Sequence, residues 1–369
     1  MLTKVEITNF KNFNEIFIFD LSDTKNFEFN RESVRNGIIN KALIYGQNGC
    51  GKSNLGFAIF DMVSHLIDNF FMKSKYENYL NADSTKNKAS FRFTFILNDI
   101  EVIYEYSKKD YQTLISEKLT IDNKEILSID REKSTKFKIE MEGAETLKTD
   151  VGDSNISIIS YVAQNSILNK NLINRAFSDF RTFVNNMLFY KILDERIYLG
   201  FEQGNQSIED YIVEQNELDN FEKLLNSIGV KCRLKTKNID GKSCIFSVFK
   251  NREIRLSHIS SSGTKAIEVF YFWYLKIREK KASFVFIDEF DAFYHHDLSR
   301  LVIKMLKEII DTQIILTTHN TSNISNDLLR PDCYFLMHPN RIKSLSRSTP
   351  QELRKAHNIE KMYRAGAFE

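Results

Sequence analysis

Residues 46–53 read Gly-Gln-Asn-Gly-Cys-Gly-Lys-Ser, which matches the phosphate-loop pattern G-x-x-x-x-G-K-S. Glycines let a backbone curl so that its N–H groups point at phosphate oxygens, and a helix that begins there adds the positive end of its dipole. Lys52 has the reach for the β- and γ-phosphates, and the Ser53 hydroxyl is a suitable Mg²⁺ ligand. The pattern predicts an ATP site formed by Gly46, Gln47, Asn48, Gly49, Cys50, Gly51, Lys52, Ser53 and Asn54.

The two elements that such a loop needs flank it in the sequence. The apolar run 42–45 precedes the loop and predicts a buried strand, and residues 55–66 follow it with helical spacing. The alternative is a glycine-rich strand-to-helix turn that binds nothing. The strand, the Lys-Ser pair and the helix together favour the phosphate site.

A second set of chemically capable residues follows later in the chain. The apolar run 283–287 ends in Asp288 and Glu289. A nucleotide hydrolase needs one carboxylate in the Mg²⁺ shell and one to orient or deprotonate water, and we assign these roles to Asp288 and Glu289 in that order. The next predicted strand, 313–317, leads to His319, which could reach a γ-phosphate. The alternatives are a solvated acidic turn and a capping histidine.

Two further segments have less specific patterns. Residues 260–264, Ser-Ser-Ser-Gly-Thr, open a predicted helix over 264–280, where hydroxyls and a glycine suit an anion, although a simple serine N-cap explains them too. Gln164 follows the apolar run 156–162, which predicts a buried strand. A glutamine there could touch Mg²⁺ or the attacking water, and it could equally be a polar loop residue.

The remaining pattern predicts elements that would position these residues. Residues 1–8 and 14–20 predict two strands, and 21–40 an irregular polar insertion. Alternation with a period of two over 88–140 predicts an antiparallel β layer. Residues 165–228 are predicted to be mostly helical, and strands return over 230–256.

From residue 263 onward, predicted helices alternate with predicted strands. The helices are 264–280 and 297–311, and the strands are 283–288, 313–317 and 332–337. This alternation favours an α/β fold with a mostly parallel or mixed core sheet. We divide the chain into an ATPase lobe at 1–164, a helical and β insertion lobe at 165–256, and a core region at 257–369.

Composition excludes several classes of protein. The hydrophobic fraction of 42% and the charged fraction of 27% are ordinary for a globular domain, and a net charge of +2 gives no global basic field for nucleic acid. The four cysteines show no metal spacing and suit a reducing cytoplasm. The chain opens as a strand rather than as a signal peptide, and its apolar stretches are too short for a membrane span. We therefore expect a cytoplasmic protein without a membrane partner.

The order of these motifs resembles that of the ATP-binding-cassette (ABC) ATPases: Walker A at 46–53, a Q-loop at Gln164, a signature at Ser261-Ser262-Gly263-Thr264, Walker B at Asp288-Glu289, and a switch histidine at His319. The opening, residues 5–13, resembles the non-transporter branch shared by chromosome-maintenance and recombination-repair ATPases, which implies that Lys11 and Asn12 lie near the nucleotide. The signature departs from the transporter form, because Ser262 and Thr264 stand where a glycine and a glutamine are usual.

More closely, the chain is similar to stand-alone bacterial ATPases of phage-defence and abortive-infection modules. Three segments carry this likeness: the S-x-G-T signature, the acidic strand continuing through residues 290–295, and the tail 358–368. The resemblance implies an ABC-type head that dimerises around ATP and Mg²⁺. Lys52 and Ser53 of one copy would hold a nucleotide that Ser261 and Gly263 of the other copy cap. Glu289 would be the general base, and His319 would sense the γ-phosphate.

The leading hypothesis is a sensor ATPase that controls a separately encoded effector, a nuclease. No nuclease-type acidic cluster follows His319, and no long heptad arm is present. One alternative is a DNA-repair or DNA-scanning ATPase that binds nucleic acid through Lys231, Arg233, Lys235 and Lys237, which a solvated strand face also explains. Another alternative is an ATP-stabilised scaffold, against which Asp288 and Glu289 argue. A transporter subunit fits the opening strands and the signature poorly.

Overall fold

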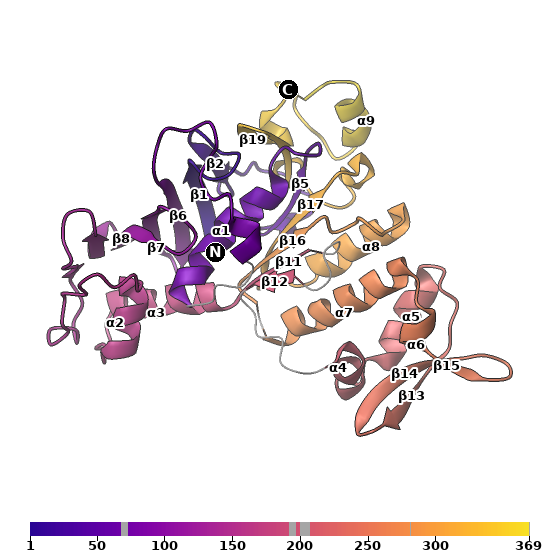
Figure 1. The fold of residues 1–369 in the computed structure, drawn as a ribbon. Coiled ribbons are helices and arrows are strands. Elements are labelled where there is room, and N and C mark those ends of the chain that lie inside the picture. The colour runs from indigo at the N-terminus through magenta and orange to yellow at the C-terminus, as the bar shows by residue number, and fades with distance from the viewer. Residues whose placement is uncertain (68–72, 192–196, 200–206, 281, 369) are drawn as a thin grey trace.

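The computed structural model describes residues 1–67, 73–191, 197–199, 207–280 and 282–368. Two large sheets dominate it, with α1 (Lys52–Leu66) between them and a small lobe at one end (Figure 1). The α/β fold with its mixed core sheet agrees with the prediction from sequence.

The first sheet is antiparallel throughout. Its order is β10-β9-β8-β7-β6-β1-β2, with β1 (Leu2–Thr8), β2 (Phe17–Asp20), β6 (Ala89–Leu97), β7 (Ile100–Lys108), β8 (Leu114–Ile121), β9 (Lys124–Asp130) and β10 (Lys138–Ile139). In β6 the side chains of Phe91, Phe93 and Phe95 are buried while Ser90 and Arg92 face solvent. This alternation confirms the antiparallel layer that the sequence predicts over 88–140.

The second sheet forms the core. Its order is β12-β11-β16-β17-β5-β18-β19, with β12 (Ile197–Leu199), β11 (Met187–Lys191), β16 (Phe284–Asp288), β17 (Gln313–Thr318), β5 (Lys41–Tyr45), β18 (Tyr334–His338) and β19 (Arg341–Ser344). The five strands from β11 to β18 pair in parallel. Their carboxyl ends therefore meet at one edge, where the polar residues that follow each strand come together.

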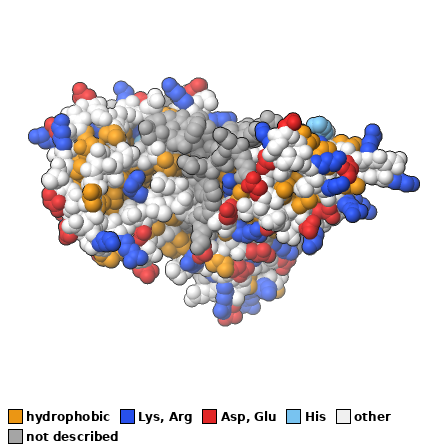
Figure 2. Space-filling model, turned by 90° about the horizontal axis from the view of Figure 1, so that it is seen from below, with side chains coloured by type: hydrophobic (Ala, Val, Ile, Leu, Met, Phe, Trp, Pro, Cys, Tyr) orange, Lys and Arg blue, Asp and Glu red, His pale blue; other side chains and the backbone are white. Residues whose placement is uncertain are grey.

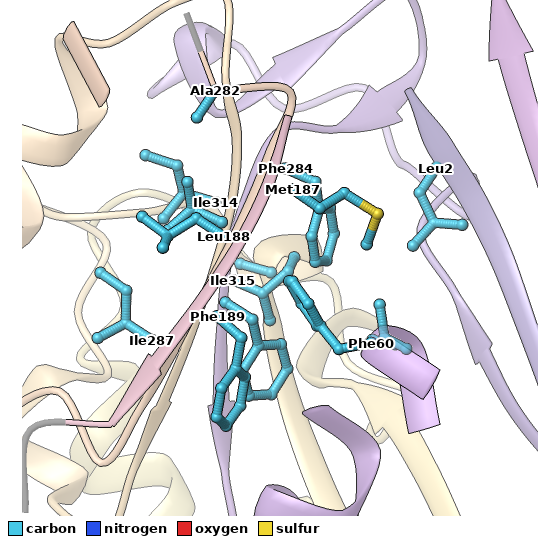
Figure 3. Close-up of a cluster of buried hydrophobic side chains, with 14 of the residues drawn as sticks. Leu2, Phe60, Met187, Leu188, Phe189, Ala282, Phe284, Ile287, Ile314 and Ile315 are labelled. Atoms are coloured by element: carbon cyan, nitrogen blue, oxygen red, sulfur yellow. The ribbon is translucent and has the colours of Figure 1, made fainter. Parts of the chain in front are cut away.

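Aromatic side chains attach α1 to the core sheet. Phe60 of α1 lies against Phe189 and Phe284, with ring centroids 5.5 and 6.1 Å apart, and Figure 3 shows this cluster with Ile315 beside it. The strands β16 and β17 are buried along their whole length. The helix that carries Lys52 and Ser53 is thus fixed against the strand that ends in Asp288.

Helices and a third sheet complete the fold. The other helices are α2 (Ile158–Asn165), α3 (Leu172–Asn185), α4 (Ile208–Glu214), α5 (Leu218–Ser227), α6 (Leu256–Ile259), α7 (Ser262–Lys280), α8 (His296–Lys307) and α9 (Ile359–Arg364). The third sheet is β13-β14-β15, formed by β13 (Leu234–Ile239), β14 (Lys242–Val248) and β15 (Glu253–Arg255). The predicted insertion 21–40 contains a short 3-10 helix, Arg31–Ser33, and the short pair β3 (Val34–Arg35) and β4 (Ile38–Ile39).

One prediction of local structure is wrong. The run 156–162 forms the start of α2 rather than a strand, because Ser157 accepts a hydrogen bond from the Ser160 N–H as an N-cap and Ile158, Ile159 and Val162 share a buried helical face.

The region 165–228, predicted to be mostly helical, contains α3, α4 and α5 and also the short strands β11 and β12. The apolar run of β11 is short enough to be a fully buried strand, which periodicity alone does not distinguish from a helix. Residues 192–196 and 200–206 of this region lie outside the described residues.

A buried ion pair connects α1 with the antiparallel sheet. The Lys108 ammonium lies 3.0 Å from Asp61 Oδ2, and neither side chain is exposed to solvent. Lys108 also donates to Ser64 Oγ, and Tyr106 donates to the same Asp61 oxygen. Because each charge needs the other in this environment, removing one partner leaves an uncompensated group in the core.

We expect Lys108→Met to lower the free energy of unfolding by about 3–5 kcal/mol. Lys108→Met combined with Asp61→Asn should recover part of this loss, because the double variant has no unpaired charge. Urea unfolding followed by circular dichroism measures both values. Equal stability of Lys108→Met and the wild type would mean that the pair contributes nothing to the contact between α1 and the sheet.

Within the described part of the chain, the structure has no helix of the length and apolar character that crossing a membrane requires.

Candidate functional site

The phosphate loop joins β5 to α1 at the carboxyl edge of the core sheet. Gly49 and Gly51 have φ values of 78° and 104°, which glycine adopts far more readily than other residues. A side chain at Gly51 would also lie 2.5 Å from Nδ2 of Asn12. Asn54 donates a hydrogen bond of 2.7 Å to Asn12 Oδ1, so Asn12 braces the start of the helix.

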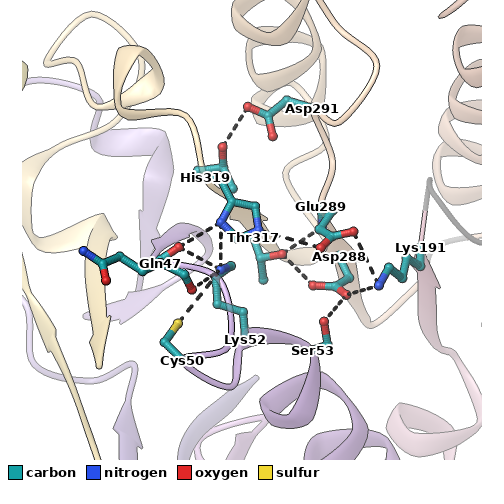
Figure 4. Close-up of polar contacts among 12 residues, drawn as sticks. Gln47, Cys50, Lys52, Ser53, Lys191, Asp288, Glu289, Asp291, Thr317 and His319 are labelled. Carbon is teal, nitrogen blue, oxygen red and sulfur yellow. Dashed lines mark hydrogen bonds and ion pairs between the residues drawn. The ribbon is translucent and has the colours of Figure 1, made fainter. Parts of the chain in front are cut away.

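Lys52 is buried and turned back onto its own loop. Its ammonium donates to the carbonyl oxygens of Gly46 (2.8 Å) and Gln47 (3.1 Å) and lies 3.2 Å from His319 Nδ1 (Figure 4). Burial is the largest influence on this side chain and lowers the pKa of Lys52, while Asp288 and Glu289 act in the opposite direction. Phosphate oxygens would be stronger acceptors for this ammonium than the two carbonyl groups that hold it.

Ser53 and Asp288 meet directly. Ser53 Oγ donates to Asp288 Oδ2 over 2.6 Å, and Thr317 Oγ1 donates to Asp288 Oδ1 over 2.7 Å. The Thr317 hydroxyl also accepts the Glu289 N–H at 2.8 Å. Thr317 therefore orients both acids at the end of β16. Sequence reasoning missed this role, because nothing in the spacing distinguishes Thr317 from its neighbours.

Glu289 has an unusual backbone. Its φ is 51°, in the left-handed region that costs a residue with a side chain about 1–3 kcal/mol. The carboxylate points back across the end of the sheet, with Oε1 3.7 Å from His319 Nε2. The other oxygen, Oε2, is buried and accepts no hydrogen bond from any residue that the structure describes. The Lys191 ammonium lies 3.4 Å from this oxygen, and a carboxylate placed here is the kind of group that can serve as a general base.

His319 lies between the loop and Glu289. Its Nδ1 is 3.0 Å from the Gly46 carbonyl oxygen and 3.2 Å from the Lys52 ammonium. Nδ1 donates to the Gly46 oxygen in one tautomer and accepts from Lys52 in the other, and the second tautomer directs an Nε2 N–H toward Glu289. The strand order brings His319 to the loop, because β17 pairs with both β16 and β5.

Lys191 is a fourth charged residue of the site, and no motif in the sequence points to it. It ends β11, in register with Asp288 on the neighbouring parallel strand. Its ammonium lies 3.7 Å from Asp288 Oδ2 and 3.4 Å from Glu289 Oε2. The contact depends on the pairing of β11 with β16, and the sequence predicted helix rather than strand in this region.

The signature residues lie elsewhere. Ser261 Oγ accepts the Thr264 N–H at 3.2 Å and caps α7, and a side chain at Gly263 would meet the Phe293 carbonyl oxygen at 3.4 Å. Ser261 is exposed, and neither it nor Gly263 hydrogen-bonds to the phosphate loop in the described structure. Figure 1 shows α6, which leads into α7, beside the small sheet at the lower right, well apart from β5 and the start of α1.

Two predicted site residues are placed differently from expectation. Gln164 is exposed near the end of α2, and Ser160 of the same helix donates to the Leu66 carbonyl oxygen at the far end of α1 from the loop. The structure therefore does not bring Gln164 to the metal site. Lys11 lies in the predicted region, but its ammonium donates to the Lys75 carbonyl oxygen at 2.7 Å instead of facing the loop. Burial lowers the pKa of Lys11.

The donor set fits Mg²⁺ that arrives with a nucleotide. Ser53 and Asp288 place two hard oxygen donors side by side at the loop. Across the described ranges, no cluster of three or more His, Cys, Asp or Glu side chains could hold a metal by itself. Magnesium usually takes one or two protein ligands and completes its shell with phosphate oxygens and water, which agrees with this arrangement.

The phosphate loop, the paired acids and the histidine meet at one edge of a parallel sheet that lies beside an antiparallel sheet, and this arrangement is that of a phosphate-loop ATPase. The chain belongs to the family described as "AAA domain, putative AbiEii toxin, Type IV TA system", whose model matches residues 41–325. It is an ATP-hydrolysing enzyme of this class. No curated protein matches the chain.

Solved structures support the fold. The chain is similar to the SmcHead solved with the C-winged helix domain of ScpA, at 15% identity and a TM-score of 0.52, over 94% of this chain and 99% of that one. The SMC head domain from Thermotoga maritima matches at 16% identity and a TM-score of 0.45, over 93% of this chain and 98% of that chain. The fold assignment therefore rests on the SmcHead structure, whose TM-score is 0.52.

Proposed function

We propose that this protein is a Mg²⁺-dependent ATPase that dimerises head to head around ATP. In this role it acts as the sensor of an anti-phage defence module. The observation that carries the proposal is the separation within one copy between the phosphate loop and the exposed signature at Ser261 and Gly263. A single head therefore presents two half-sites, and a second copy supplies what each lacks.

The residues of one head have distinct tasks in this scheme. Lys52 exchanges the carbonyl oxygens of Gly46 and Gln47 for phosphate oxygens. Bound Mg²⁺ would neutralise charge that develops on the phosphates. Ser53 and Asp288 are the residues that would hold it. Glu289 takes the proton of the attacking water, and His319 couples that carboxylate to the loop.

The dimer model makes a direct prediction for Ser261→Arg. Because Ser261 is exposed at the start of α7, the substitution should cost no more than its N-cap, about 0.5–2 kcal/mol, and should leave the phosphate loop of its own copy intact. It should block the partner head sterically. We expect ATP affinity within about twofold of the wild type and turnover lowered about 100-fold or more.

Fluorescent-nucleotide titration and phosphate release measure the two quantities, and Ser227→Arg, at the end of α5, is a matched control. Turnover retained in Ser261→Arg would overturn the head-to-head model.

The defence role rests on family membership and on the sequence resemblance to abortive-infection ATPases. We propose that the closed, ATP-bound dimer controls a separately encoded effector, a nuclease, in the cytoplasm. Affinity purification of the tagged protein from its native host, with and without phage infection, tests this assignment. Recovery of a stoichiometric nuclease supports it, and recovery of the ATPase alone in both conditions contradicts it.

Direct binding of nucleic acid is the second candidate function. Figure 2 shows Lys and Arg side chains around the protruding end on the right of the view. However, Lys235 and Lys237 of β13 both pair with Glu253, at 3.2 and 2.6 Å, which reduces their attraction for phosphate. These ion pairs make β13 a weak candidate for a nucleic-acid surface.

The outer face of the antiparallel sheet is a second surface that carries cations. It is hollowed to about 800 Å³, and a cross-strand row of Thr8, Ser90, Ser107 and Ser116 lies across it. Six cations border the hollow: Lys88, Arg92, Lys118, Lys133, Lys136 and Lys138. The first four pair with acids of the same face, so their attraction for phosphate is reduced as well. Retention on duplex DNA that falls steeply with salt would favour this function, and no retention at low salt would exclude it.

A further inference from the structure

A lysine lies beside the two acids at the end of β16, Asp288 and Glu289. Lys191 is the last residue of β11 and pairs in parallel register with Asp288, so its side chain lies at the same edge of the sheet as both acids. Only 19% of the Lys191 side chain is exposed, and Asp288 is fully buried. The ammonium approaches Asp288 Oδ2 at 3.7 Å and Glu289 Oε2 at 3.4 Å, as Figure 4 shows.

The two acids differ in how the rest of the site supports them. Asp288 accepts hydrogen bonds from Ser53 and Thr317, one on each oxygen. Glu289 Oε2 accepts none from the described residues, so its nearest compensating charge is Lys191. The Lys52 ammonium donates to the carbonyl oxygens of its own loop and forms no hydrogen bond with Glu289 in the described structure.

Two neighbouring carboxylates in a largely buried site repel each other, and a positive charge close to both offsets that repulsion. Lys191 supplies that charge from the side opposite the phosphate loop. A divalent cation held by Ser53 and Asp288 would supply it as well, and the two positive charges would then repel each other at short range. The lysine and the metal therefore compete for the same pair of acids.

We propose that Lys191 is the resident counter-ion of the metal site. It keeps Asp288 and Glu289 charge-balanced in the nucleotide-free protein and holds the affinity of that state for free divalent metal low. Metal then enters together with the nucleotide, whose phosphates outweigh the repulsion. This inference rests on the proposed role of Asp288 as metal ligand.

The test is direct metal binding without nucleotide. Mn²⁺, followed by electron paramagnetic resonance, is titrated into the full-length wild type and into Lys191→Met. We expect the variant to bind Mn²⁺ at least about tenfold more tightly, because one nearby positive charge is gone. Lys191→Arg should keep the wild-type value. Lys307→Met, which removes a paired lysine 2.7 Å from Glu32, controls for general loss of a cation and should not change Mn²⁺ binding.

Thermal unfolding gives a second readout. Lys191→Met should melt at a lower temperature than the wild type in EDTA, and millimolar Mg²⁺ should restore most of the difference, whereas the wild type should change little. Lys191→Gln serves if the methionine variant is poorly soluble. Unchanged Mn²⁺ affinity, or instability that Mg²⁺ does not repair, would overturn the proposal and leave Lys191 as a structural ion pair.

Two further measurements separate this inference from the function on which it rests. Asp288→Asn combined with Lys191→Met should lose the gain in Mn²⁺ affinity, and a gain that persists would place the metal elsewhere and overturn both assignments. ATP binding by the wild type tests the nucleotide site independently. A wild type that binds ATP beside a Lys191→Met variant with unchanged Mn²⁺ affinity would overturn only the role of Lys191.

Discussion

Lys52→Ala should lose nucleotide binding while the protein stays folded. The ammonium is buried at the phosphate loop and is the only cation held by the loop's own carbonyl groups among the described residues. Removing a buried, hydrogen-bonded charge from one side of a contact typically costs about 2–5 kcal/mol or more. ATP affinity should therefore fall by about 30-fold to more than 1,000-fold.

The cost to the fold should be far smaller. In the nucleotide-free protein Lys52 makes hydrogen bonds to two loop carbonyl oxygens, each contributing about 0.5–1.5 kcal/mol. Titration with a fluorescent ATP analogue measures affinity, and circular dichroism confirms the fold. Lys25→Ala, which removes a lysine bonded to the Ser346 carbonyl oxygen, is the matched control. Wild-type ATP affinity in a folded Lys52→Ala protein would contradict the phosphate-site assignment.

Glu289→Gln should separate binding from hydrolysis. The amide has the same shape as the carboxyl group and fits the same strained backbone at φ 51°, but it cannot take a proton from water. We expect turnover to fall by about 100- to 10,000-fold, the usual contribution of a general base. Affinity for ATP should stay close to the wild-type value, because Lys52 and Ser53 are unchanged.

The same variant should accumulate as a dimer when ATP and Mg²⁺ are present. Slow hydrolysis leaves the closed state populated, and light scattering after gel filtration measures the mass. Glu352→Gln, an exposed acid paired with Arg354, should behave as the wild type. Normal turnover in Glu289→Gln would show that another group is the base. Slow turnover without a dimer would leave the base assignment intact and contradict the dimer.

Some of the site was predictable because its signals are local. The phosphate loop needs particular residues at fixed spacing between a strand and a helix. In the structure β5 ends at Tyr45 and α1 begins at Lys52, directly on either side of the loop. Asp288 follows an apolar run that folds as β16, and the alternation after residue 263 correctly indicates parallel strands. Parallel strands bring their carboxyl ends together, so His319 could be expected near the acids.

Other parts depend on contacts between residues far apart in sequence. Thr317 orients both acids only because β17 lies beside β16, and Gln164 leaves the site because Ser157 caps a helix where a strand was expected. Lys191 reaches Asp288 through the pairing of β11 with β16. The positive φ of Glu289 could not be predicted, because a glutamate rarely adopts this conformation.

By itself the sequence predicted a nucleoside triphosphate site at residues 46–53 and the acids Asp288 and Glu289 that would serve it, because a phosphate loop is encoded in one short segment. Only the tertiary structure decided that Lys191 lies beside those acids and that the start of α7 lies apart from the phosphate loop of its own copy. Strand order and helix placement set those distances, and they follow from how the whole core packs rather than from any local pattern.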